Sequence, residues 1–266
     1  MKYFLTTLFF KLWITLCMAQ GISVSPSRIF FKGGAGQTVS QTITLNNATS
    51  TEFNFIASLK DWDRDSLGNK RYYPAGQRKQ SNAAWLSLSE NSAHIAPGET
   101  KLLNLTLTIP PASEAAQLTN SMLFLTQVKE QQKGLQNGLN VNVLLEVGIQ
   151  VYHTPNGLVA GNLEFLAFED RGVVSESAGH KARRMQVKIK NTGQINKDGY
   201  LRFELTNTAT GEEIPIKAAA IALLPEAVQW IQVDLPAELK GHYLAVAILD
   251  AGSQYDLKIA EKEITY

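Results

Sequence analysis

Short runs in which apolar and polar residues alternate recur along most of this chain, separated by clusters of Gly, Asn, Asp and Pro. Alternation with a period of two residues is typical of β-strands that bury one face, and a sustained helical period is absent. In the first half the pattern predicts strands at residues 22–29, 38–46, 53–59, 85–88, 103–109, 122–128 and 139–152. About seven short strands in roughly 135 residues is the spacing of a β-sandwich. Pro26, inside the first strand, marks a sheet edge or a switch between sheets.

The same pattern restarts after a turn cluster, Thr-Pro-Asn-Gly, at residues 154–157. It predicts further strands at residues 162–168, 185–190, 200–206, 212–217, 228–233, 243–249 and 257–264. The Ala-rich stretch 218–224 is short and ends at Pro225, so we expect strand and loop there. The expected fold class is therefore all-β, with two immunoglobulin-like β-sandwich domains in tandem at residues 20–156 and 157–266.

The first nineteen residues differ from the rest of the chain. Lys2 precedes an apolar stretch that only Lys11 interrupts, and Cys17 and Ala19 place small residues before Gln20. This arrangement predicts a signal peptide at residues 1–19, cleaved before Gln20. The alternative is an uncleaved anchor helix, but a membrane span needs about 20 apolar residues. Cleavage removes the only cysteine, so we expect an exported protein without disulfides.

Composition and charge narrow the classes of partner. The chain is 44% hydrophobic and 18% charged, as in an ordinary globular protein. Without residues 1–19 the 25 basic residues fall to 23 against 24 acidic ones. A nearly neutral protein gives no electrostatic reason to expect nucleic acid or an anionic membrane as partner. No second long apolar run occurs either, so we expect no membrane insertion.

The residues that could carry chemistry form no recognisable catalytic or metal site. Asp61, Asp63 and Asp65 resemble the start of a calcium loop, but Ser66 stands where that loop needs Gly and Tyr72 where it needs Glu. We interpret residues 61–71 as a solvated hairpin loop. The four histidines lack metal-ligand spacing, and no nucleophile elbow is present. The sequence thus predicts no cofactor, no metal and no enzymatic activity.

The stretch 139–152 stands out by its length and its regular alternation. As one strand it would extend about 43 Å, roughly twice the usual length. One interpretation is a long core strand. The other is an overlong edge strand that a partner covers, because exposed alternating aliphatics are an aggregation hazard. The candidate partner-binding residues are Leu139, Val141, Val143, Leu145, Val147 and Ile149.

Several short motifs, taken in order, resemble a known family. They are SPSRIFF at 25–31, TITLNN at 42–47, WLSL at 85–88, IAPG at 95–98 and GIQVYHTP at 148–155. Together they are similar to the periplasmic chaperones of the chaperone–usher pilus pathway, the PapD-like superfamily, and especially to its divergent members from Bacteroidetes-type bacteria. The second half fits more loosely, through VKIKNTG at 187–193 and GHYLAVAI at 241–248.

The resemblance implies a function and two further site residues. Such chaperones donate an edge strand to an incomplete immunoglobulin-like subunit, and an arginine and a lysine bind the C-terminal carboxylate of the subunit. Arg28 matches the arginine, whereas Gln150 occupies the position of the lysine. A lone guanidinium can still bind a carboxylate through two hydrogen bonds, and Gln150 can donate a neutral one. The sequence gives Arg28 no acidic neighbour in the adjacent strand, so we expect its donors to be free.

The leading hypothesis is therefore a periplasmic chaperone for surface or fimbrial subunits. Its expected partners are an incomplete immunoglobulin-like surface or pilus subunit and, in addition, an outer-membrane usher. The alternative is a cell-surface adhesion or binding module made of two immunoglobulin-like domains. A hydrolase is a third class, for which the sequence offers no catalytic constellation.

Overall fold

The computed structural model describes residues 21–111, 115–128, 131–136, 139–175 and 181–266, and for residues 131–136 and 139–142 it describes the backbone alone. The expected signal peptide, residues 1–19, lies outside the described residues. Within the described ranges, strands form two successive β-sandwiches, as the alternation predicted. The same ranges contain no helix long and apolar enough to cross a lipid bilayer.

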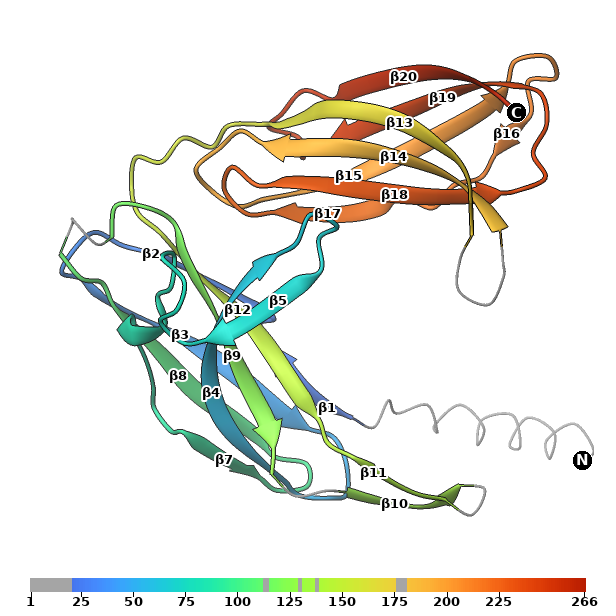
Figure 1. Cartoon of the computed structure of the whole chain (residues 1–266). Coiled ribbons are helices and arrows are strands. Elements are labelled where there is room, and N and C mark those ends of the chain that lie inside the picture. The colour runs from blue at the N-terminus through green and yellow to red at the C-terminus, as the bar shows by residue number, and fades with distance from the viewer. Residues whose placement is uncertain (1–20, 112–114, 129–130, 137–138, 176–180) are drawn as a thin grey trace, which may run out of the picture.

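The first sandwich consists of two packed sheets (Figure 1). One has the order β1-β3-β8-β6, and the other has the order β2-β12-β9-β4-β5, with β7 paired to β4. The strands are β1 (Ile22–Ser25), β2 (Arg28–Lys32), β3 (Thr38–Asn47), β4 (Phe53–Arg64), β5 (Lys70–Pro74), β6 (Leu86–Leu88), β7 (Ser92–Ile95), β8 (Thr100–Thr108), β9 (Thr119–Gln127) and β12 (Glu146–Thr154). A further pair, β10 (Gln131–Gln136) and β11 (Leu139–Val143), forms its own two-stranded sheet.

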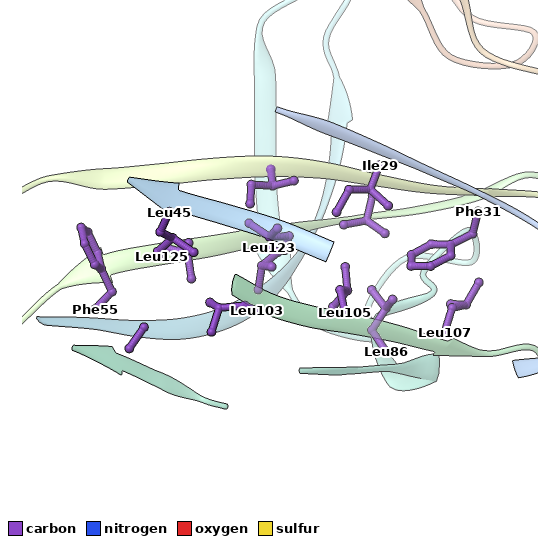
Figure 2. Close-up of a cluster of buried hydrophobic side chains, with 14 of the residues drawn as sticks. Ile29, Phe31, Leu45, Phe55, Leu86, Leu103, Leu105, Leu107, Leu123 and Leu125 are labelled. Carbon is purple, nitrogen blue, oxygen red and sulfur yellow. The ribbon is translucent and has the colours of Figure 1, made fainter. Parts of the chain in front are cut away.

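Alternating side chains from the two sheets form the core of this sandwich. In β8, Leu103, Leu105 and Leu107 are almost fully buried, and Ile43 and Leu45 of β3 pack beside them. Figure 2 shows such side chains meeting between the sheets. Because successive residues of a strand point to opposite faces, the period of two in the sequence translates directly into this inner face.

The first predicted strand changes from one sheet to the other at Pro26. Residues 22–25, before Pro26, pair antiparallel with β3, whereas β2, after it, pairs parallel with β12. The peptide bond between Ser25 and Pro26 is cis. The switch is thus confirmed, and it places Arg28 at the start of the second sheet, directly opposite Gln150 of β12.

The second sandwich contains the sheets β13-β14-β18 and β16-β15-β19-β20, with β17 paired to β15. Its strands are β13 (Leu163–Ser175), β14 (Lys181–Asn191), β15 (Lys197–Asn207), β16 (Glu213–Ile214), β17 (Ala219–Leu223), β18 (Val228–Pro236), β19 (His242–Asp250) and β20 (Lys258–Thr265). The strand expected in the Ala-rich stretch is therefore present as β17. The predicted domain boundary falls between Thr154 and Leu163, in the connection of the two sandwiches, and as a limit of independent folding it stays a prediction.

The two sandwiches meet through an apolar cluster and through the tip of the β4–β5 hairpin (Figure 1). Tyr152 belongs to this cluster, against which Leu224 of the second sandwich packs. At the hairpin tip, the amide of Trp230 donates to the carbonyl of Ser66 at 2.7 Å. Gly68 has a φ of +87° and leaves no room for a Cβ beside the side chain of Gln229. The hairpin therefore fixes one sandwich against the other.

The expected solvated loop at residues 61–71 is wrong for its first part. Strand β4 continues to Arg64, and Asp61 in it is fully buried. Its carboxylate accepts the Arg78 amide at 2.7 Å and the Ser81 hydroxyl at 2.5 Å, so the burial is compensated by hydrogen bonds. Only the turn 65–69 is a loop. The polar residue types misled the prediction, because the Asp61 carboxylate accepts its hydrogen bonds from residues distant in the sequence.

Stability should decrease as the pH falls below about 6.5, because of the buried His153. Its Nε2 lies 3.2 Å from the Gly33 carbonyl, while its Nδ1 is buried without a partner. Burial lowers the pKa of His153, and the Gly33 carbonyl offsets part of that effect. The unfolded chain then binds a proton more readily, so stability is lost from the unfolded pKa down to the folded one. Denaturant unfolding at pH 7.5 and 5.5 measures the loss, and His153→Gln should reduce it; an equal loss in the variant would contradict this assignment.

Candidate functional site

The long strand predicted at residues 139–152 is interrupted. The structure divides it into β11 and β12 at Leu144 and Leu145, and this corrects the expectation of one continuous ribbon. The division lies where β9 ends. The Gln127 amide donates to the Leu145 carbonyl at 2.9 Å, and its side-chain oxygen accepts the Leu145 amide at 3.2 Å. Beyond this point β11 pairs only with β10 among the described strands, and Figure 1 shows the pair projecting beyond the sandwich.

The predicted aliphatic side chains fall into different environments. Val143 is 44% exposed, whereas Leu145 is half-buried and packs against the core of the first sandwich. Val147 is half-buried as well, and Ile149 is fully buried within that core. The side chains of Leu139 and Val141 lie outside the described residues. The core interpretation therefore holds for the end of β12, whereas Val143 is exposed and its part in binding a partner stays a prediction.

One side of β12 is partly unpaired. On that side β2 pairs with Gln150–Thr154, and no described strand pairs with Glu146–Ile149. The Gln150 amide donates to the Ser27 carbonyl at 3.1 Å, so it points to this side. The N–H and C=O groups of successive residues point to opposite sides of a strand. The backbone groups of Gly148 and Glu146 therefore point to the same side as those of Gln150. We call residues Glu146–Ile149, with the adjoining β11, the open edge.

Arg28 lies where β2 begins, beside the open edge. Its side chain forms an ion pair with Asp198 of β15, which corrects the expectation that all its donors are free. The side chains of Arg28 and Asp198 are 32% and 52% exposed, so water reaches both. The described part of the adjacent strand, β12, places Gln150 and no acidic residue opposite Arg28. The ion-pair partner, Asp198, comes from the other sandwich, and no feature of the sequence indicated that pairing.

Gln150 is nearly buried, and the Tyr152 hydroxyl donates to its side-chain oxygen at 2.7 Å. Burial raises the pKa of Tyr152 well above its ordinary value, so the phenol stays protonated and can donate. Tyr152 stacks on Phe30 with ring centroids 5.1 Å apart and meets Trp62 edge-on at 5.9 Å. The three aromatic rings pack against one another and form a continuous surface next to Arg28.

Two further cations lie over the Trp62 ring, and the sequence analysis did not identify either of them. The Arg64 guanidinium lies 5.7 Å from the centroid of the Trp62 ring, and the Lys70 ammonium lies 5.8 Å from it. Arg64 and Lys70 are register partners in the β4–β5 hairpin. The interpretation of residues 61–71 as a loop concealed this pairing. A hairpin around the turn 65–69 would have placed both residues on one face.

A cleft of about 620 Å³ opens between the sandwiches beside these residues. Trp62 and Arg64 line it from the first sandwich, and residues 223–229 line it from the second. Asp63, also in the lining, is neutralised by Arg71 at 2.8 Å and by Arg78 at 2.8 Å. Within the described residues, no three His, Cys, Asp or Glu side chains lie close enough to hold a metal ion. The arrangement offers an open strand edge and cationic groups, which suit an extended acidic or carboxylate-terminated segment.

The chain matches no protein-family model, and no curated protein matches it. It is similar in fold to solved pilus chaperones. The complex of the CsuC chaperone and the CsuE tip adhesion subunit, from archaic chaperone-usher Csu pili of Acinetobacter baumannii, matches with 14% identity and a TM-score of 0.48, covering 91% of this chain and 97% of that one. The complex of SafA pilin with the SafB chaperone of Salmonella enterica matches with 13% identity and a TM-score of 0.47, covering 94% and 98%. The CupB2 chaperone of Pseudomonas aeruginosa matches with 11% identity and a TM-score of 0.44, covering 90% and 99%.

Because the identities are 14% or less and the TM-scores lie below 0.5, these matches assign no role to any residue of this chain. The function has to follow from the open edge, the projecting strand pair and the cations beside them.

Proposed function

We propose that this chain is a periplasmic chaperone that binds an incomplete immunoglobulin-like surface or pilus subunit along its open edge. The subunit would lack one strand, and the chaperone would supply β11 and the start of β12 in its place. An outer-membrane usher is a further proposed partner. Export through the signal peptide at residues 1–19 would place the protein in the periplasm.

The observation that carries this proposal is the unpaired side of β12. The backbone groups of Glu146 and Gly148 face a side on which no described strand pairs, and exposed Val143 and Leu144 adjoin them. An unpaired edge with exposed aliphatic side chains is a hazard for an exported protein unless a partner covers it. Addition of a strand satisfies the backbone groups and buries the aliphatics together.

The direction of the added strand follows from its position. It would lie on the side of β12 that β2 also uses, directly ahead of the start of β2 at Arg28. A strand parallel to β12 would end there, and its C-terminal carboxylate would meet the guanidinium. A strand in the opposite direction would bring its N-terminal ammonium to Arg28, which like charge disfavours. The geometry thus favours a parallel strand with a free carboxylate.

Asp198 would then act as a placeholder for that carboxylate. In the unoccupied protein it pairs with Arg28, and both side chains are in contact with water. A guanidinium has five donors, so it can bind a second carboxylate while keeping the first or exchange one for the other. Exposed ion pairs stabilise a protein by about 1 kcal/mol or less, so the exchange costs little.

Hydrogen exchange in the presence of a model strand tests the proposal. The probe is an acetylated nonapeptide with Val at alternate positions, Thr and Asn between them, and a free C-terminal carboxylate. We expect it to slow exchange at the amides of Glu146 and Gly148, because these would donate to the added strand. A peptide of the same length with Ser in place of every Val is the control. Protection elsewhere, with these two amides unchanged, would favour the alternative of an adhesion module that binds through another face.

A further inference from the structure

We propose that Lys70 supplies the second cation of the carboxylate site, the one for which β12 offers only Gln150. The inference rests on the proposed function and adds a residue to its binding site. It places that cation on β5, at the opposite edge of the same sheet, rather than on β12, the strand that carries Gln150.

A continuous row of contacts leads from Arg28 to Lys70. Arg28 is the register partner of Gln150, and Gln150 accepts the hydroxyl of Tyr152. Tyr152 contacts the Trp62 ring, and the Lys70 ammonium lies over that ring. All five side chains therefore belong to one outer face of the sheet, at the opening between the two sandwiches.

The electrostatics of Lys70 agree with this placement. Partial burial of the ammonium lowers the pKa of Lys70, and the positive charges of Arg64 and Arg28 lower it further, so both guanidiniums act on its ammonium. No carboxylate among the described residues is within ion-pair distance of Lys70, and Asp198 compensates only Arg28. The group of three cations and one carboxylate is thus short of negative charge, which an incoming carboxylate would supply.

Lys70 is better suited to this role than Arg64. The Arg64 guanidinium donates to the Gly68 carbonyl at 2.6 Å, so it is used to hold the hairpin turn. Lys70 is exposed, and its flexible ammonium can move from the Trp62 ring toward a ligand. A cation held over an aromatic ring at an exposed site is bound only weakly, so such a movement costs little.

Paired peptides that differ only at the C-terminus test the inference. The nonapeptide above is compared as free acid and as C-terminal amide, and the ratio of the two dissociation constants reports on the carboxylate site alone. We expect the acid to bind the wild type about one hundredfold more tightly. Lys70→Gln should lower this ratio by about three- to tenfold, whereas Lys101→Gln, which removes the same charge from the opposite sheet, should leave it unchanged. Lys70→Arg should keep it.

A rescue variant separates a role in binding from a structural one. In the Lys70→Gln background, Gln150→Lys should restore the preference for the acid, because it returns a second cation to the side of Arg28. If Lys70→Gln keeps the wild-type ratio while Arg28→Ala removes it, the inference about Lys70 is wrong and the proposed function stands. If the wild type binds the acid and the amide equally, the carboxylate site is wrong, and if it binds neither peptide, the proposed function is wrong as well.

Discussion

Arg28→Ala should weaken binding of the peptide acid by about 1.5–3 kcal/mol, which is about tenfold to one hundredfold in the dissociation constant. The variant removes the guanidinium that the C-terminal carboxylate would meet at the start of β2. Binding of the peptide amide should change much less, because the backbone groups of the open edge remain. Calorimetric titration of both peptides measures the two effects.

Asp198→Asn is the matched control, because it breaks the same ion pair and leaves the guanidinium in place. We expect it to bind the peptide acid at least as tightly as the wild type, since the competing carboxylate is gone. Both variants should lower the melting temperature only slightly, because the pair is exposed to water. If both variants weaken binding equally and both show a large drop in melting temperature, Arg28 stabilises the contact between the sandwiches and does not bind a ligand.

Ile149→Glu should prevent folding of the first sandwich, whereas Val143→Glu should leave it folded and abolish peptide binding. Ile149 is fully buried in the core, where an unpaired carboxylate costs several kcal/mol, a large part of the stability of a whole domain. Val143 is 44% exposed, so a charge there should change stability by about 0.5 kcal/mol or less.

The loss of binding in Val143→Glu has a separate cause from any loss of fold. A carboxylate on the open edge would have to be desolvated under the added strand, which opposes association. Circular dichroism and thermal unfolding report on the fold, and titration with the peptide reports on binding. Val143→Thr, which keeps a β-branched side chain without charge, should bind. Unfolding of Val143→Glu would show that this side chain belongs to the core, and unimpaired binding would remove it from the site.

The alternation of apolar residues was enough to predict most of the strands and the fold class, although it missed β5, β7 and β10 and joined β11 to β12. Residues 103–109 and 139–152 each carry one apolar face, and burying such faces in pairs leaves a sandwich as the solution. A sheet edge or a sheet switch at Pro26 could be predicted as well, since proline lacks the amide that a central strand needs, and the structure shows the switch. These features depend on neighbours in sequence and on the fixed geometry of a strand.

Contacts between distant residues decided what the pattern left open. The break before β12 depends on Gln127, at the end of another strand, and the burial of Asp61 depends on partners in the segment that follows β5. The candidate carboxylate site combines Arg28 with Asp198 of the other sandwich and with Lys70 of a hairpin. The sequence alone determined which faces are apolar, because that is a property of each strand. The tertiary structure decided which charges meet, because a cation or a carboxylate takes its role from whatever the folded chain places beside it.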